Sequence, residues 1–479
     1  MSGSLYTNPV CHDALGDPFV LKHNGCWYAY GTQADGRGGI PVFRSDDLVT
    51  WERVGLALAP PADAGPCCWA PEVAYADGRF FLYYSAGGPE GEGHSLRVAE
   101  SVLPDGPFED RGELYPGAGF TIDPHPFRDS DGSWYLFHCR DFLDGERVGT
   151  GIVVDRLRTM TEAEGDPVVV VRPYAEWNVF QRRRRWAGRE DDWYTLEGAC
   201  ARRHDGRLYL LFSGGAWREP NYGVDWCVAD VPTGPWSSTG GEQAPRVLAS
   251  TPGAIGPGHC SIARGPDDVQ EYLVYHAWRD AGDRRQMRID PLVWSAAGPL
   301  CPGPSTEPRP APAEPAFRSR VRGPQGAALR SCAWHVDGRV WSAAAEREEV
   351  VARLCAVAPS EEVVASVSLA PGSLGGDAFA GVRLESDAGR AEVGAVRDGL
   401  TALWQAGHRG AGGARVSALP ADGFVHLRVW ASPSRLHVEA DGALLADIAT
   451  PHLGRLRMSL VSRSCEPRFA GAALTVPAA

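Results

Sequence analysis

The chain has 479 residues, of which 44% are hydrophobic and 22% are charged, so it has a globular composition and enough length for two or three domains. Its net charge of −13 argues against a nucleic-acid partner, because phosphate binding requires basic surfaces. The one basic run, 182–185, is closely followed by acidic residues and is interpreted as a solvated loop. No stretch approaches about 18 consecutive apolar residues, so we expect neither a membrane span nor a membrane partner.

The cysteines and the N-terminus bear on the compartment. The 12 cysteines show no metal-binding spacing, and many lie in apolar segments, where a thiol acts as a small hydrophobic side chain. No basic segment followed by an apolar one is visible at the N-terminus. Together these features predict a cytoplasmic location, with secretion by a non-standard route as the alternative.

A pattern of short strands recurs five times in the first 300 residues. Each copy begins near an ionisable residue, passes through an apolar run and a turn, and reaches an aromatic strand. The high counts of glycine (57) and proline (38) are typical of an all-β chain with many tight turns. The ionisable residues that open the copies are Asp17, Glu72, Asp123, Glu197 and His259.

Units of this length, with about four strands each, are typical of the blades of a β-propeller. One blade cannot bury both of its faces, so five blades are expected to pack around an axis with their inner strands lining a narrow channel. The openers would then share one mouth of that channel. The segment from Trp177 to Trp193 is interpreted as a loop inserted in the fourth copy. An array of β-sandwiches is the alternative, but it does not explain the repeated opener.

A proline-rich stretch separates this region from the rest of the chain. We predict a five-bladed propeller over residues 1–300, a semi-rigid linker over 301–316 and a second domain over 317–479. The second region keeps alternating strand-like runs but has no dense cluster of acids, and it is predicted to be an accessory β-sandwich of the jelly-roll type.

Three carboxylates, Asp17, Asp123 and Glu197, are the candidates for catalysis. A proline follows each aspartate, which restricts the preceding backbone and fixes the direction of the side chain. Three acids at one channel mouth repel one another, so the pKa of at least one should rise. Glycoside hydrolysis needs this combination of a protonated carboxyl and an ionised carboxylate. Taken singly, each aspartate is more often a strand cap than a catalyst.

The first region resembles glycoside hydrolase family 43, which includes five-bladed arabinofuranosidases, β-xylosidases and arabinanases. The second region resembles, with weaker motif support, the concanavalin-type (laminin-G-like) sandwiches. The motifs that carry the first resemblance, in chain order, are Gly16-Asp17-Pro18, Ser45-Asp46-Asp47-Leu48-Val49-Thr50-Trp51, Trp69-Ala70-Pro71-Glu72-Val73, Ile122-Asp123-Pro124, Leu196-Glu197-Gly198 and Gly258-His259.

The resemblance implies roles for the three acids. The family inverts anomeric configuration, so Asp17 would be the general base that activates water and Glu197 the general acid. Asp123 would orient the acid and tune its pKa. Inversion implies that the base and the acid lie about 6.5–9.5 Å apart, which leaves room for the water.

The resemblance also implies a metal and an arginine. His259 would face a hydrated metal ion, often calcium, through water, although no cofactor is required for the chemistry. Arg288 matches a family arginine that approaches the sugar and could steady the base carboxylate. A hydrogen-bonded channel histidine and a surface ion pair are the alternatives for these two residues.

Aromatic residues supply candidate sugar platforms. Trp69 and Phe43 are the first choices, although most aromatic residues of a propeller belong to its core. Trp193, shortly before Glu197, is predicted to shape the pocket rim, and Asp35 is a further candidate at the mouth.

The sequence therefore predicts an inverting, exo-acting α-L-arabinofuranosidase that acts on arabinose-containing oligosaccharides. β-Xylosidase and endo-arabinanase are the alternatives within the family. A non-catalytic sugar-binding propeller is the alternative from another class, and the intact trio of acids argues against it.

Overall fold

The structure, a computed structural model, describes residues 4–476 except 34–37, 90, 238–239, 280–283, 319–333, 338–339, 344–348, 357–361, 387, 407–408, 417–422, 433, 451–455 and 466. It divides into two compact units, one formed by Met1–Lys22, Trp27–Ala263 and Gln270–Ala311 and the other by His23–Cys26, Arg264–Val269 and Pro312–Ala479. The division after Ala311 falls inside the segment predicted to be the linker. Within the described residues, no helix is long and apolar enough to cross a membrane.

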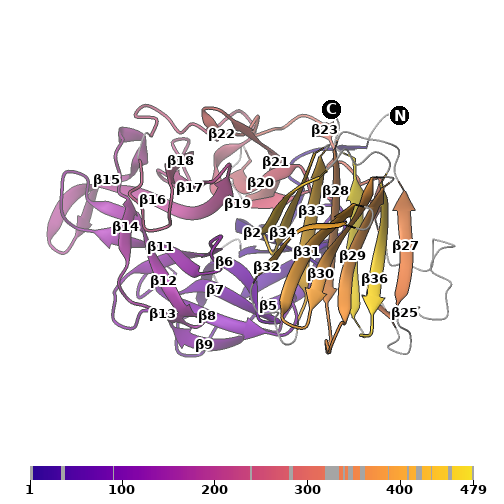
Figure 1. Ribbon diagram of the computed structural model, residues 1–479. Helices are drawn as coiled ribbons and strands as arrows, with labels where there is room; N and C mark the ends of the chain where they lie inside the picture. Colours follow the sequence, from indigo (N-terminus) through magenta and orange to yellow (C-terminus); the bar gives the residue numbers. More distant parts are fainter. Residues whose placement is uncertain are drawn as a thin grey trace. The chain divides into compact units, whose positions relative to one another are not determined.

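The first unit is the predicted five-bladed propeller, built from antiparallel strands that follow one another in sequence (Figure 1). Successive strands of a blade pair with their neighbours, and we call the first strand of each blade its inner strand. A short parallel pairing of β12 with β16 joins the third and fourth blades. The blades comprise β2 (Gly16–His23), β3 (Cys26–Thr32), β4 (Ile40–Ser45) and β5 (Glu52–Leu58); β6 (Cys67–Ala76), β7 (Arg79–Gly87), β8 (Ser95–Ser101) and β9 (Glu109–Glu113); β10 (Thr121–Arg128), β11 (Trp134–Phe142), β12 (Gly149–Thr159) and β14 (Val168–Val171), with the short β13 (Glu162–Ala163) beside β12; β16 (Arg189–His204), β17 (Arg207–Gly214) and β18 (Gly223–Ala229); and β19 (Ile255–Arg264), β20 (Glu271–Trp278), β21 (Arg285–Ser295) and β22 (Gly298–Leu300).

The blades are held together by apolar cores that lie between neighbouring blades. Tyr30 of the first blade packs with Leu82 of the second in one such core, and equivalent clusters fill the other interfaces between consecutive blades. A further cluster joins Trp27 of the first blade to Val274 and Ile289 of the fifth. Because the last blade packs on the first, the sheets form a closed ring around an axis, as a propeller requires.

The N-terminal segment also ties the ends of the ring together. β1 (Leu5–Tyr6) pairs with β23 (Arg309–Pro310), which follows the fifth blade. The Asn8 side chain then binds β21 through both of its ends: Nδ2 donates to the carbonyl of Ile289 at 2.8 Å, and the N–H of Ile289 donates to Oδ1 at 3.0 Å.

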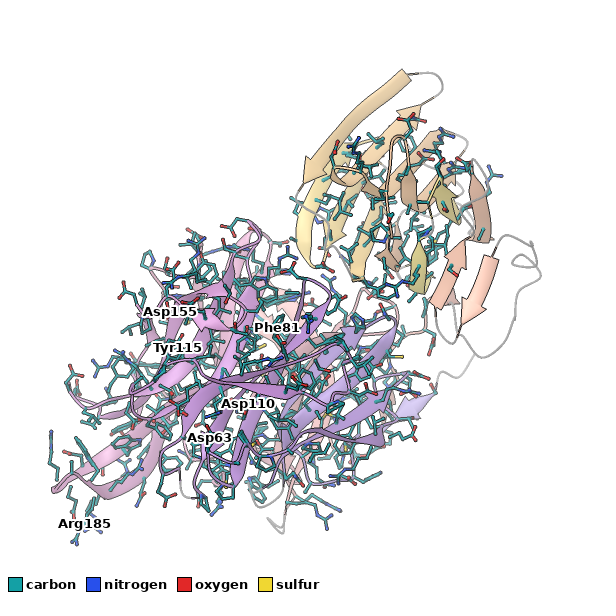
Figure 2. All side chains as sticks on the ribbon, turned by 90° about the horizontal axis from the view of Figure 1, so that it is seen from below. Asp63, Phe81, Asp110, Tyr115, Asp155 and Arg185 are labelled. Atoms are coloured by element: carbon teal, nitrogen blue, oxygen red, sulfur yellow. The ribbon has the colours of Figure 1, made fainter. Side chains whose placement is uncertain are left out.

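The segment inserted in the fourth copy is a β-hairpin, not the predicted loop. β15 (Val179–Trp186) pairs with β16 after the 3₁₀ helix η1 (Glu176–Asn178), and β16 continues without a break into the inner strand that carries Glu197. The basic run lies on β15, and its charges are matched across the hairpin, with Arg182 bonded to Asp192 at 2.7 Å. Arg185 lies at the hairpin's outer end with 87% of its side chain exposed (Figure 2).

The second unit is the predicted β-sandwich of two antiparallel sheets, whose shared core includes Val367, Val382, Trp404 and Leu460. One sheet contains β24 (Phe317–Arg318), β25 (Trp334–Asp337), β26 (Val340–Ala343), β28 (Val363–Ala370), β33 (Val425–Ser432), β34 (Arg435–Ala440), β35 (Ala443–Ala449) and β37 (Arg468–Thr475). The other contains β27 (Val350–Ala356), β29 (Phe379–Ser386), β30 (Gly389–Val396), β31 (Gly399–Ala406), β32 (Arg409–Val416) and β36 (Arg457–Arg463).

Candidate active site

Each inner strand of the propeller contains a residue in the left-handed backbone region where the strand turns, and β19 contains a second one, Gly256, three positions earlier. Such a conformation is unfavourable for residues with a Cβ atom and persists only where the surroundings hold it. In three blades the pairing register with the second strand shifts at this point, which marks a bulge. The residues and their φ angles are Asp17 (48°), Ala70 (46°), Asp123 (57°), Gly198 (60°) and His259 (47°).

A side chain from the preceding blade accepts a hydrogen bond from the N–H of each of these five residues. Ser213 Oγ accepts from His259 at 2.7 Å, and Thr32 Oγ1 accepts from Ala70 at 2.9 Å. Such bonds satisfy N–H groups that the bulge withdraws from the ladder. We call the four acceptors that lie in the second strand of their blade the latch residues: Thr32, Ser85, Ser213 and His276. The N–H of Gly198 donates instead to Asp123 Oδ2, on the inner strand of the preceding blade, at 3.0 Å.

The latches place two of the three candidate acids. Asp17 and Asp123 are themselves left-handed residues, and their N–H groups donate to His276 Nδ1 at 3.1 Å and Ser85 Oγ at 3.4 Å. Burial lowers the pKa of His276 well below its usual range, so its ring is neutral and Nδ1 is free to accept. Glu197 does not share this position, because the left-handed residue of its strand is the following Gly198. The structure corrects the prediction that all three acids open their strands at one equivalent point.

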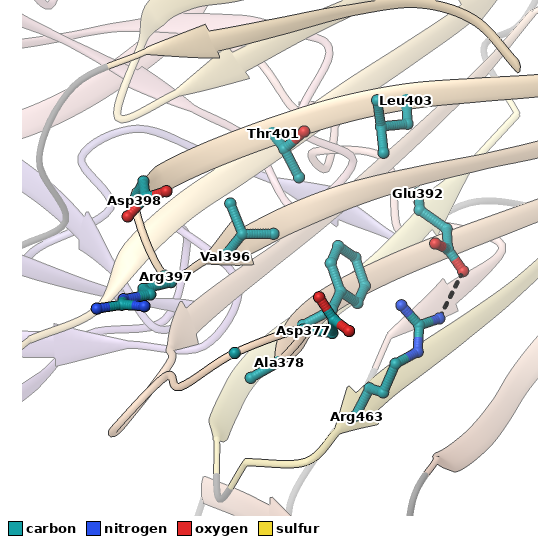
Figure 3. Close-up of a pocket in the computed structure, with 11 residues that line it drawn as sticks. Asp377, Ala378, Glu392, Val396, Arg397, Asp398, Thr401, Leu403 and Arg463 are labelled. Atoms are coloured by element: carbon teal, nitrogen blue, oxygen red, sulfur yellow. Dashed lines mark hydrogen bonds and ion pairs between the residues drawn. The ribbon is translucent and has the colours of Figure 1, made fainter.

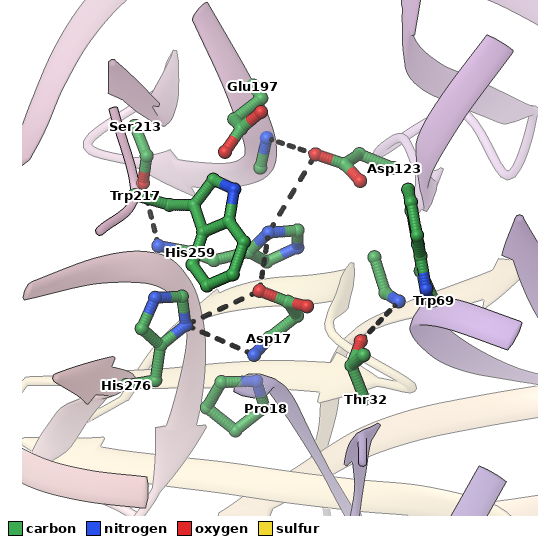
Figure 4. A network of polar contacts seen from close by, with 12 residues as sticks. Asp17, Pro18, Thr32, Trp69, Asp123, Glu197, Ser213, Trp217, His259 and His276 are labelled. Carbon is green, nitrogen blue, oxygen red and sulfur yellow. Dashed lines mark hydrogen bonds and ion pairs between the residues drawn. The ribbon is translucent and has the colours of Figure 1, made fainter. Parts of the chain in front are cut away.

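Asp17 is held as an ionised carboxylate. Arg285 donates to Asp17 Oδ1 at 2.6 Å. His259 Nδ1 lies 3.4 Å from the same oxygen (Figure 4). Burial alone would raise the pKa of Asp17, but Arg285 and then His259 hold it well below its usual range. The carboxylate is therefore available as a base throughout the neutral range.

The other two acids are held in their protonated forms. Burial, followed by the charge of Asp17, raises the pKa of Asp123 to about 8. Burial, followed by Asp123, raises the pKa of Glu197 to about 8, although the Tyr222 hydroxyl donates to Glu197 Oε1 at 2.7 Å. Asp123 Oδ2 accepts a hydrogen bond at 3.0 Å from the N–H of Gly198, the residue after Glu197. This bond links Asp123 to the backbone that carries Glu197. One ionised and one protonated carboxyl at one mouth is an arrangement suited to general acid–base chemistry.

Of the aromatic residues predicted to contact the sugar or shape the pocket, one lies at the site and two are buried away from solvent. Trp69 lies at the site, half-buried and stacked on His94 with 3.7 Å between ring centroids (Figure 4). Phe43 is only 3% exposed in the core between the first and fifth blades, and the structure therefore does not bring it to the mouth. Trp193 is likewise 3% exposed, because Arg184 covers its ring at 4.3 Å. Asp35 lies outside the described residues.

The arginine at the base is Arg285, not the predicted Arg288. Arg288 donates to the backbone carbonyls of Gly253 and Ser305 and so has a structural position. The two residues are separated by an odd number of positions on β21, and alternate side chains of a strand point to opposite faces. Arg285 also stacks over Trp217 at 4.5 Å, which brings a second aromatic residue to the site that the sequence reasoning missed (Figure 4).

The latch residues, too, were missed, although the sequence contains a signal for three of them. Thr32, Ser85 and Ser213 each follow the glycine of their blade's hairpin turn at the same spacing. A small hydroxyl side chain at this constant spacing marks the end of these three second strands.

The described residues do not form a direct metal site. His259 Nδ1 faces the carboxylates of Asp17 and Asp123, at 3.4 and 3.7 Å. In the parts of the chain that the structure describes, no group of three or more His, Cys, Asp or Glu side chains is arranged to hold a metal ion. Calcium takes about six to eight oxygen ligands, so water would have to supply most of them. The calcium ion stays a prediction, and no step of the proposed reaction depends on it.

The second unit contains a separate pocket (Figure 3), lined by residues that include Asp377, Arg397 and Thr401. Its Arg463 is already bound to Glu349 at 2.8 Å and lies 3.4 Å from Glu392. The three candidate acids all lie in the first unit, so we assign the chemistry to the propeller.

Comparison with known proteins shows which family the propeller matches. The model of glycosyl hydrolases family 43 matches residues 6–300, which span the whole propeller. A solved structure, described as a thermostable family-43 glycoside hydrolase, superposes with a TM-score of 0.57 and 32% identity, over 64% of this chain and 99% of that one.

Two curated relatives are informative. The β-D-galactofuranosidase of Aspergillus niger is 29% identical over 324 residues, which cover 62% of this chain and 84% of the relative. An extracellular exo-α-(1→5)-L-arabinofuranosidase of Streptomyces avermitilis is 23% identical, over 61% of this chain and 62% of the relative.

The predicted cytoplasmic location is wrong, because the Streptomyces avermitilis relative, among others that match, is an extracellular enzyme. The cysteines misled the prediction. The free cysteines among the described residues are buried, except for the half-buried Cys301. Buried thiols are inert and pack as small hydrophobic groups, so their presence does not distinguish a reducing compartment from an oxidising one.

The latches can be tested by removing one acceptor. Ser213→Ala leaves the buried N–H of His259 without a partner, so we expect unfolding in urea to show a loss of about 1–3 kcal/mol. Ser130→Ala, in an exposed turn, is the control and should change stability by less than about 0.5 kcal/mol. Equal stability of both variants would contradict the latch.

Proposed function

The chain belongs to glycosyl hydrolases family 43, and we propose that within this family it is an inverting, exo-acting α-L-arabinofuranosidase. The observation that carries the proposal is the separation of charge states between Asp17 and Glu197, which have opposite pKa shifts at one channel mouth. A carbohydrate-binding propeller without activity would have no use for a protonated carboxyl beside an ionised one.

In the proposed reaction, Asp17 takes a proton from a water molecule while the oxygen of that water attacks the anomeric carbon. Glu197 gives its proton to the glycosidic oxygen as the bond from that oxygen to the anomeric carbon breaks. The products are the free sugar with inverted configuration and the oligosaccharide shortened by one residue. Proton transfer through water returns Asp17 and Glu197 to their starting states. Arg285 keeps the base ionised, and Tyr222 orients the acid through Oε1.

Asp123 is proposed to support the acid and not to react. Its carboxyl binds the N–H of Gly198, the residue next to Glu197. An ionised Asp123 would raise the pKa of Glu197, and an ionised Glu197 would raise the pKa of Asp123. The two acids therefore titrate as a coupled pair. Trp69 and Trp217 are proposed to line the sugar subsite.

The proposed sugar follows from the names of the relatives. One relative acts on β-D-galactofuranosides and another on α-(1→5)-linked L-arabinofuranosides. Both substrates contain a five-membered ring with related hydroxyl positions, and they differ in the exocyclic chain. A terminal furanoside is therefore the substrate class, with arabinofuranoside preferred. We propose that this chain releases the sugar outside the cell, where the relative from Streptomyces avermitilis acts. β-Xylosidase and endo-arabinanase are the remaining candidates within the family.

A panel of substrates tests this function. The purified protein is assayed on nitrophenyl α-L-arabinofuranoside, β-D-galactofuranoside and β-D-xyloside, and on linear arabinan. We expect the arabinofuranoside to have the highest kcat/KM. Asp17→Asn and Glu197→Gln should lower kcat by about 10²–10⁴-fold. Asp166→Asn, at an exposed position, is the control. The loss in Glu197→Gln should shrink on a dinitrophenyl glycoside, because a good leaving group needs no proton. Unchanged activity in both catalytic variants would contradict the assignment.

The pH profile tests the charge states. Activity should fall as pH rises through about 8, because Glu197 then loses the proton that it must donate. Asp17 must be ionised, and its low pKa keeps the acid limb of the profile far below neutrality. Arg285→Met removes the main charge that lowers this pKa, so the acid limb of kcat/KM should move to higher pH. Arg207→Met, at an exposed site, should leave the limb in place. An unmoved limb in Arg285→Met would mean that Asp17 is not the titrating base.

A further inference from the structure

A buried pair of ionisable residues lies in the propeller channel and has no part in the proposed reaction. Glu72 of β6 and His125 of β10 are 4% and 7% exposed, with 2.6 Å between Glu72 Oε2 and His125 Nδ1. The other ring nitrogen of His125 contacts a third blade, because the N–H of Ala201 on β16 donates to Nε2 at 2.9 Å. One imidazole therefore links the inner strands of three consecutive blades.

The contacts fix the protonation of this histidine. Nε2 accepts a hydrogen bond from a backbone N–H, so it carries no proton, and the ring hydrogen is on Nδ1. That hydrogen points at Glu72, whose Oε2 accepts it. Burial raises the pKa of Glu72, although His125 opposes the shift. A buried acid is costly unless it has a partner, so retaining one for packing alone would be unfavourable.

The pair acts at the bulge that carries Glu197. The register of β16 shifts between Glu197 and Cys200, so this stretch lacks part of its ladder bonding. Two side chains of β10 hold it instead: Asp123 binds the N–H of Gly198 on one side, and His125 binds the N–H of Ala201 on the other. β10 has its own bulge between Ile122 and His125, so the two bulges are cross-linked side by side.

We propose that Glu72 and His125 are positioning residues that hold the bulge of β16, and with it the carboxyl of Glu197, in place for proton donation. The inference rests on the proposed function, because it assigns Glu197 the role of the acid. Glu72 fixes the ring orientation and tautomer of His125, and His125 fixes the backbone at Ala201. Neither residue touches the sugar.

The test separates the length of the residue-72 side chain from its acidity. Glu72→Gln has the same length and keeps an oxygen that can accept from Nδ1, but it cannot ionise. Glu72→Asp keeps the carboxyl group but is one methylene shorter, so it cannot span the 2.6 Å contact without moving the ring. We expect kcat to fall about tenfold to a hundredfold in Glu72→Asp and much less in Glu72→Gln, with KM nearly unchanged in both, because a displacement of about 1 Å is enough to cost this much.

A second readout distinguishes positioning from folding. In Glu72→Asp, the loosened bulge should hydrate Glu197, lower its pKa and move the alkaline limb of kcat to lower pH. A smaller fraction of folded molecules would lower kcat by the same factor at every pH and would not move the alkaline limb. Circular dichroism measures that fraction. His138→Gln removes another buried imidazole of the same unit, on β11, and is the matched control.

The outcomes are distinct. Higher kcat in Glu72→Gln than in Glu72→Asp, together with the shifted limb, supports the proposal. Equal kcat in the two variants, higher kcat in Glu72→Asp, or an unmoved limb overturns it. If the unaltered protein cleaves no glycoside in the panel, the proposed function fails; if it is active but the Glu72 variants do not differ, only the positioning role fails.

Discussion

The site depends on one backbone constraint, repeated around the ring. Each inner strand turns through a left-handed residue, and a side chain from the preceding blade accepts a hydrogen bond from its N–H. A left-handed aspartate outside such a setting would relax to an ordinary strand conformation and point its carboxyl elsewhere. Because every latch crosses a blade boundary, the geometry of the site depends on closure of the whole ring. The apolar cores between the blades are therefore a condition of the chemistry as well as of stability.

The same arrangement separates the charge states of the acids. Asp17 and Asp123 have equivalent backbone positions, yet their pKa values shift in opposite directions. The difference arises from their neighbours, since Arg285 contacts Asp17 while Asp123 faces other acids. Glu197 lies one residue before the left-handed position of its strand, which gives its carboxyl a different direction from those of the aspartates. Asp17 is thus the candidate base, Asp123 the residue that tunes the pKa of the acid, and Glu197 the candidate acid.

Much of this was predictable from the sequence. The repeated openers and turns predicted the propeller, the proline-rich stretch predicted a boundary, and the motifs identified Asp17, Asp123 and Glu197 as candidates. The errors have physical causes. Arg288 and Arg285 lie on opposite faces of β21, and sequence alone does not set the register of a strand against its neighbours. Phe43 and Trp193 are aromatic residues near the motifs, but burial by the fifth blade and by Arg184 depends on tertiary packing. The sequence predicts a loop where β15 and β16 form a hairpin, because the run of arginines on β15 hides the alternation of a strand.

The anomer of the first product tests the central claim most directly. The claim is that Asp17 activates water on the face of the sugar opposite to Glu197, which requires inversion. Proton NMR during the first turnovers on an α-L-arabinofuranoside should show β-L-arabinofuranose appearing first and then equilibrating. If α-L-arabinofuranose appears first, the configuration is retained. Asp17 would then have to act as a nucleophile or lie outside the reaction, and its role as the general base would be contradicted.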